Sequence, residues 1–185
     1  MQDMPIYKLE NLAYHEAIPG HHMQIAIALE VKGMPNFRKY GGYSVFSEGW
    51  ALYSETLPKE IGLYKDPYSD FGRLSGELWR ACRLVVDTGI HHYRWTREEG
   101  IDYYMNNTAN PEGDCVGMVE RHIVWPGQAV SYKIGMLKIQ ELRAHAEETL
   151  GDTFSLQGFH DVVLKNGGVS MDILQDIVYE WIENQ

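Results

Sequence analysis

The stretch Tyr14-His15-Glu16-Ala17-Ile18-Pro19-Gly20-His21-His22-Met23-Gln24 carries the most informative pattern in the chain. A His-Glu pair followed shortly by another His is typical of a zinc-binding helix. In such a helix imidazole nitrogens hold the metal and the Glu takes a proton from metal-bound water. The usual spacing is H-E-x-x-H, but here Pro19 holds the fifth position and the next His follows at i+6. The pattern predicts a metal site with a longer spacing than usual.

The Pro19-Gly20 pair interrupts a helix that the sequence otherwise predicts from about residue 7 to residue 31. On an ideal helix His15 and His21 would lie about 120° apart and could not share a metal. We expect a kink at Pro19-Gly20 to absorb two extra residues and to bring His21 back to the face of His15. His22 returns to that face without distortion but lies about 10 Å further along the axis. We therefore favour His21 as the second ligand, with His22 as the alternative.

Glu48 is the best candidate for a third ligand, because a catalytic zinc takes three protein ligands and one water. It lies in a helix predicted from Ser44 to about Leu57, close enough in sequence for the chain to return beside the first helix. Its neighbours are apolar or small, so an unpaired carboxylate would be costly there. Glu55, two turns later on a similar face, is the reserve.

The rest of the chain predicts further helices and no strand of any length. Apolar spacing and capping signals place them at about 68–95, 96–107, 111–124, 128–150, 155–165 and 170–183. Thr96 and Glu99 form a capping box, and Asn110-Pro111 reads as an N-cap followed by a first-turn proline. The predicted fold class is all-α, with about eight helices in a single domain over residues 1–185.

The composition excludes several classes of partner. A net charge of −10 over 185 residues argues against a nucleic-acid or anionic-membrane surface, because phosphate binding needs clustered cations. No apolar run approaches membrane-spanning length, and the first residues lack the features of a signal peptide. A cytoplasmic location, or a periplasmic one if an upstream signal exists, stays open. Cys82 and Cys115 are expected to be buried free thiols.

Five segments carry a family resemblance: YHEAIPGHHMQ, FSEGWALYSE, VVDTGIHHYRW, RHIVWPGQAVSYKIGMLKI and FHDVVLKNGGVSMDILQDIV. They resemble the C-terminal part of the bacterial domain-of-unknown-function family 885, whose members carry H-E-x-x-P-G-H-x-x-Q. That family is similar in turn to helical zinc peptidases of the thimet oligopeptidase and Taq carboxypeptidase kinds.

The resemblance implies a zincin-like helical fold and a Zn2+ cofactor held by His15, His21 and Glu48, with Glu16 as the general base. It also implies a longer chain with a large helical part before the motif. We therefore expect residues 1–185 to be a fragment or a shortened relative.

Tyr132 and His91 are candidates to stabilise a developing oxyanion. Tyr132 follows a Gly-containing turn at a helix start, and the related peptidases use a Tyr near such a turn in this way. His91 lies four residues after Asp87, so the carboxylate could orient its imidazole. A core tyrosine and a helix hydrogen-bond pair are the structural alternatives.

The expected function is metal-assisted hydrolysis of a peptide or other amide substrate. Two hypotheses stand beside it: hydrolysis of another bond, such as an ester, and a helical scaffold or homo-oligomerisation module with a vestigial metal site. The sequence does not separate these substrates, because specificity depends on the walls of the cleft.

Overall fold

A computed structural model describes residues 5–185, and every regular element among them is a helix, which confirms the all-α prediction. The elements are η1 (Ile6–Lys8), α1 (Leu9–Glu16), α2 (His21–Glu30), α3 (Asn36–Tyr40), α4 (Ser44–Ser54), α5 (Leu57–Glu60), α6 (Pro67–His91), α7 (Arg97–Asn107), α8 (Glu112–Val124), α9 (Ser131–Leu150), η2 (Gly151–Thr153), α10 (Leu156–Leu164) and α11 (Met171–Glu183). Nine of these described α-helices have eight residues or more, against about eight predicted.

Two of the expected helices are broken where a proline follows. The segment predicted as one kinked helix is two helices, α1 and α2, with Pro19-Gly20 in the connection between them. The helix expected to run to Leu57 ends at Ser54, and Pro58 lies in the first turn of the short α5. Proline is tolerated in a first turn because its missing N–H has no helical partner there.

One of the two predicted caps is present, and two serine caps occur that were not predicted. Thr96 and Glu99 form the predicted capping box at the start of α7, and Ser155 and Ser170 cap α10 and α11. The expected Asn110 cap is wrong, because Pro111 is the N-cap of α8 and the amide of Asn110 donates to Asp114 instead.

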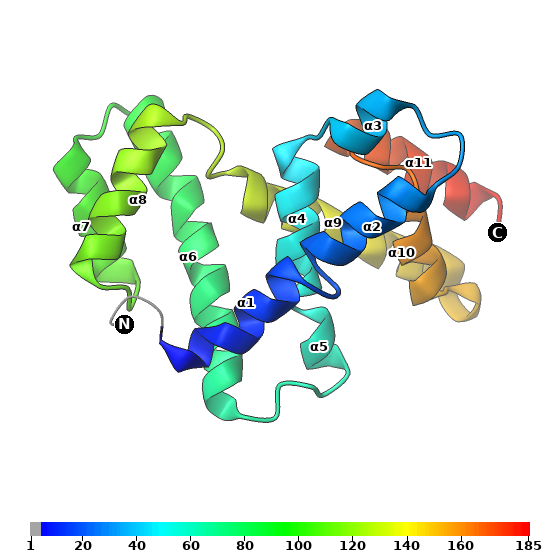
Figure 1. The fold of residues 1–185 in the computed structure, drawn as a ribbon, viewed down its shortest axis with the longest axis horizontal. Coiled ribbons are helices and arrows are strands. Elements are labelled where there is room, and N and C mark those ends of the chain that lie inside the picture. The colour runs from blue at the N-terminus through cyan, green and yellow to red at the C-terminus, as the bar shows by residue number, and fades with distance from the viewer. Residues whose placement is uncertain (1–4) are drawn as a thin grey trace.

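The helices gather around two apolar clusters (Figure 1). One lies among α6, α7 and α8 and contains both free cysteines, Cys82 and Cys115, each buried as expected. The other joins α4 and α9 to α10 and α11. Helices α1 and α2 run across the middle of the view, between the two ends. Within the described residues, no helix combines the length and the apolar content needed to cross a bilayer.

Helices α4 and α9 pack backbone to backbone at Gly49 and Gly135. A Cβ added to Gly49 would lie 2.5 Å from the Cα of Gly135, and one added to Gly135 would lie 2.0 Å from the carbonyl oxygen of Val45. Only glycine fits at either position. This contact places Glu48 of α4 near Tyr132 of α9.

Candidate metal centre

The α1–α2 connection turns the chain so that two histidines face each other. His15 lies in the last turn of α1 and His21 is the first residue of α2. The indole Nε1 of Trp50 donates to the carbonyl of Pro19 at 2.9 Å, which ties the connection to α4. Gly20 permits the turn, because a Cβ there would lie 1.8 Å from the carbonyl oxygen of His15. The helix therefore breaks, whereas a kink was expected, and the two rings lie edge to face with centroids 4.8 Å apart.

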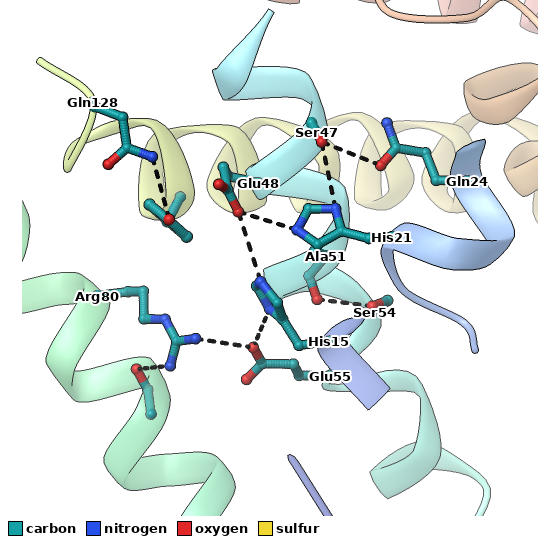
Figure 2. Close-up of polar contacts among 12 residues, drawn as sticks. His15, His21, Gln24, Ser47, Glu48, Ala51, Ser54, Glu55, Arg80 and Gln128 are labelled. Atoms are coloured by element: carbon teal, nitrogen blue, oxygen red, sulfur yellow. Dashed lines mark hydrogen bonds and ion pairs between the residues drawn. The ribbon is translucent and has the colours of Figure 1, made fainter. Parts of the chain in front are cut away.

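Glu48 completes a cluster with these two histidines (Figure 2). Its Oε2 lies 3.2 Å from Nε2 of His21 and 3.6 Å from Nε2 of His15. One ligand atom from each of the three residues lies within 4.8 Å of the others. The structure thus brings together the three residues predicted as ligands, and it places His21 in the cluster, while His22 is exposed.

The spacing of these donors fits a small tetrahedral ion. With metal–ligand bonds of about 2.0–2.1 Å, neighbouring ligand atoms of tetrahedral zinc lie roughly 3.3 Å apart. The two nitrogen–oxygen distances to Glu48 lie close to that value. The side chain of His15 is 4% exposed, but those of His21 and Glu48 are 19% and 20% exposed. One side of the cluster is open, as a catalytic centre needs for water and substrate.

Glu55 holds the ring of His15 from behind. Its Oε1 lies 2.7 Å from Nδ1 of His15, and this contact directs Nε2 of the ring at the cluster. Arg80 of α6 approaches the same oxygen at 3.8 Å. Glu55 was the reserve ligand in the sequence interpretation, but in the structure it holds the ring of His15. Glu55 lies 40 residues after His15, so no local sequence pattern indicated this pairing.

Two polar side chains hold the ring of His21. The hydroxyl of Ser47 lies 3.4 Å from Nδ1 of His21 and donates to Oε1 of Gln24 at 3.5 Å. Gln24 is the last residue of the motif quoted above and lies one turn after His21 in α2. The sequence interpretation gave neither Ser47 nor Gln24 a role. Their contacts leave Nε2 of His21 directed at Glu48.

The charges around the cluster favour a bound cation. Burial raises the pKa of Glu48, but hydrogen bonds from His15, His21 and Tyr132 outweigh it and hold the pKa well below its usual range. Burial lowers the pKa of His15, but its hydrogen bonds with Glu48 and Glu55 outweigh that effect and raise the pKa. Positive charge between these carboxylates is therefore stabilised, whether a proton or a metal ion supplies it.

The remaining predicted site residues lie in different surroundings. Glu16 ends α1 beside His15, and its side chain is exposed. Tyr132 is buried, its ring stacks 6.4 Å from that of His15, and the amide of Gln128 donates to its hydroxyl at 3.2 Å.

His91 is exposed, and its Nε2 donates to the carbonyl oxygen of His122 at 2.9 Å. Among the described residues it makes no hydrogen bond to the cluster. Asp87, expected to orient His91, instead accepts from the backbone N–H of Gly127. The structure brings Tyr132 to the cluster but gives His91 no contact with it.

The fold and the site together define an all-helical protein with a His-His-Glu cluster suited to a metal ion. The chain belongs to the family of bacterial proteins of unknown function DUF885, whose family model matches residues 1–178. No curated protein matches the chain.

Two solved structures resemble it along nearly its whole length. A protein from Colwellia psychrerythraea, provisionally named a lipoprotein, is 52% identical with a TM-score of 0.96, and the match covers 98% of this chain and 31% of that one. A protein from Shewanella oneidensis, provisionally named a lipoprotein of unknown function, is 26% identical with a TM-score of 0.87, covering 94% and 32%. The chain thus spans about a third of the length of these relatives.

Proposed function

We propose that His15, His21 and Glu48 bind one zinc ion and that the protein hydrolyses peptide or related amide bonds. The observation that carries the proposal is the convergence of both Nε2 atoms on one oxygen of Glu48 at the end of a His-Glu motif. The resemblance of the motif to that of helical zinc peptidases gives the choice of metal and bond. A zinc ion in such a site supplies a water of lowered pKa and polarises a carbonyl.

The side chains around the cluster divide the remaining work. Glu16, exposed at the end of α1, accepts a proton from the attacking water and passes it to the leaving amine. Tyr132 donates a hydrogen bond to the oxyanion, a role supported by its position beside Glu48 and by the hydrogen bond from Gln128. Tyr132 is better placed for this role than His91.

Metal analysis of the purified chain tests the proposal. We expect about one zinc per chain by mass spectrometry, and loss of that zinc in His15→Ala and Glu48→Ala. His22→Ala, at the exposed neighbouring histidine, is the matched control and should keep its zinc. If the chain contains no zinc and binds none after chelation and reloading, the proposal is refuted.

The Glu16→Gln variant separates the general base from the ligands. We expect it to bind zinc like the wild type but to lose hydrolysis by roughly 100-fold or more, because the proton acceptor is gone. Zinc content and turnover of a mixed peptide library, measured on the same preparation, check this. Full turnover in Glu16→Gln would remove Glu16 from the mechanism.

A second candidate function has an observation of its own. Helix α6 has an exposed apolar stripe on its surface. Its residues recur at helical spacing and are Phe71, Leu74, Leu78 and Val85. Such a stripe is typical of a surface that packs against another part or another copy of the protein. A scaffold or oligomerisation module is therefore the alternative. Self-association in sedimentation experiments would favour it, if the association is lost in Leu74→Glu but kept when an exposed residue of α7 is changed instead.

A further inference from the structure

Arg83 is a buried cation without an ionic partner. The residue is only 7% exposed, yet no carboxylate among residues 5–185 lies within ion-pair distance of its guanidinium, and its Nε has no hydrogen-bond partner there. The group lies over the ring of Tyr132, 4.6 Å from the centroid. Buried charges in proteins are normally paired, because an unpaired one loses its hydration without compensation. Arg83 therefore lacks an anion.

Arg80 is only partly compensated. Its Nη2 lies 3.8 Å from Oε1 of Glu55, and its Nη1 donates to the carbonyl of Gly76 at 3.2 Å. The same carboxylate oxygen already accepts from His15, and the Nε of Arg80 also has no partner among the described residues. Arg80 and His15 thus share one carboxylate oxygen, whereas Arg83 contacts no carboxylate among the described residues.

Both arginines line a cavity of about 200 Å³ between α1 and α6. The other lining side chains include those of Lys8, Asn11, Ser75 and Trp79. The carboxylate of Asp114 attracts the ammonium group of Lys8 electrostatically. The carboxylate of Glu55 forms an ion pair with Arg80. This concentration of positive charge is unusual in a chain with a net charge of −10.

The cavity is linked to the candidate metal centre through Arg80 and Glu55, although His15, His21 and Glu48 do not line it. Asn11 lies one helical turn before His15 in α1, and Arg80 contacts the carboxylate that holds His15 (Figure 2). The fork of a guanidinium matches a carboxylate with two parallel hydrogen bonds. A cavity of about 200 Å³ has room for a small part of a ligand, such as a carboxylate group, and not for a larger part.

We propose that Arg80 and Arg83 bind a free carboxylate of the substrate in this cavity, so that the preferred substrates carry a carboxylate close to the bond that is cut. The C-terminal residue of a peptide has this chemistry. The preference for cutting beside a carboxylate rests on the proposed hydrolytic function. The binding of the carboxylate does not, and it can be measured without zinc.

Calorimetric titration of the zinc-free chain tests the binding. N-acetylglycine and N-acetylglycinamide have nearly the same shape and differ in charge. We expect the acid to bind at least about tenfold more tightly than the amide, because only the acid supplies the missing anion. Equal binding of the two by the wild-type chain, or no binding of either, would overturn the proposal without any variant.

Variants assign the binding to the two arginines. Arg83→Gln and Arg80→Gln should each reduce the preference for the acid about tenfold, whereas Arg97→Gln, at an exposed arginine paired with Glu120, should keep it. Arg83→Lys, which keeps the charge and loses the fork, serves if Arg83→Gln does not fold, as judged by circular dichroism. An unchanged preference in folded Arg80 and Arg83 variants would contradict the assignment. Inorganic phosphate that binds as tightly as N-acetylglycine would overturn the choice of a carboxylate.

Kinetics connect the cavity to the reaction. With zinc-loaded protein, Arg83→Gln should raise KM for peptides with a free C-terminus by about tenfold and leave C-terminal amides unchanged. A chain that binds no zinc would refute the hydrolytic function. The carboxylate proposal would still be decided separately, by whether the zinc-free chain binds the acid more tightly than the amide.

Discussion

Glu55 decides which nitrogen of His15 faces Glu48. Its carboxylate accepts from Nδ1 and so fixes the ring with Nε2 toward Glu48. Replacing it with glutamine keeps the shape but weakens the acceptor. We expect Glu55→Gln to lower zinc affinity by roughly 10-fold to 100-fold, measured by competition with a chromophoric chelator.

The control for this change is Glu98→Gln, because the side chain of Glu98 is 73% exposed and lies on α7. It should bind zinc like the wild type. Wild-type affinity in Glu55→Gln would show that the ring of His15 is oriented by packing alone.

Residue types predicted the members of the cluster better than ideal helical geometry did. The His-Glu pair, the second histidine and an acidic residue among apolar neighbours were sufficient to choose His15, His21 and Glu48. Glu55 and Arg80 were not assigned these roles, because their contacts join helices far apart in sequence. The unpaired state of Arg83 likewise depends on what the neighbouring helices fail to supply, and no local pattern records that.

At the scale of the element, the break between α1 and α2 brings His15 and His21 together in the cluster. The sequence located the interruption at Pro19-Gly20 but predicted a kink. A continuous helix would require the chain to pass straight on from His15, whereas the described backbone folds back until Gly20 touches the carbonyl of His15. The all-α class, the capping box at Thr96 and the two serine caps follow from local signals and were predictable.

The Gly20→Ala variant tests the role of this connection. Its Cβ would lie 1.8 Å from the backbone oxygen of His15, so the end of α1 or the start of α2 must shift. We expect the free energy of unfolding to fall by about 2–3 kcal/mol and zinc affinity to fall with it, measured by urea unfolding and chelator competition.

Gly113→Ala is the matched control in α8, where a Cβ would have no neighbour within 4 Å. It should leave zinc affinity unchanged and stabilise the chain by about 0.5–1 kcal/mol, because alanine favours a helix. If Gly20→Ala behaves like Gly113→Ala, the close approach does not control the site.

At the scale of the whole molecule, each end contains one histidine whose ring is kept neutral. The Nε2 of His122 lies 2.7 Å from the hydroxyl of Tyr104 beside the α6–α8 cluster, and that of His160 lies 2.8 Å from the hydroxyl of Tyr53 beside the other. Burial, assisted by Arg83 and Arg121, lowers the pKa of His122 to about 4. Burial, assisted by Arg143, lowers the pKa of His160 to about 4.

These shifts predict a loss of stability in mild acid. In the unfolded chain both histidines bind a proton near pH 6.5, and in the folded chain only near pH 4, so acid favours the unfolded state between these values. Their contribution to stability is complete above pH 6.5, falls as the pH falls and levels off near pH 4. From pH 7 to pH 5 we expect each histidine to remove about 2 kcal/mol from the free energy of unfolding.

Urea unfolding of the zinc-free chain at pH 7 and pH 5 measures this loss. His122→Gln and His160→Gln should each make the pH dependence shallower by about 2 kcal/mol, whereas His145→Gln, at an exposed histidine, should not. Comparing variants cancels the contribution of His15, whose pKa is shifted in the opposite direction. Because the two histidines lie at opposite ends, their effects should add, and a pH dependence that runs parallel to the wild type in both variants would refute the neutral state assigned to these rings.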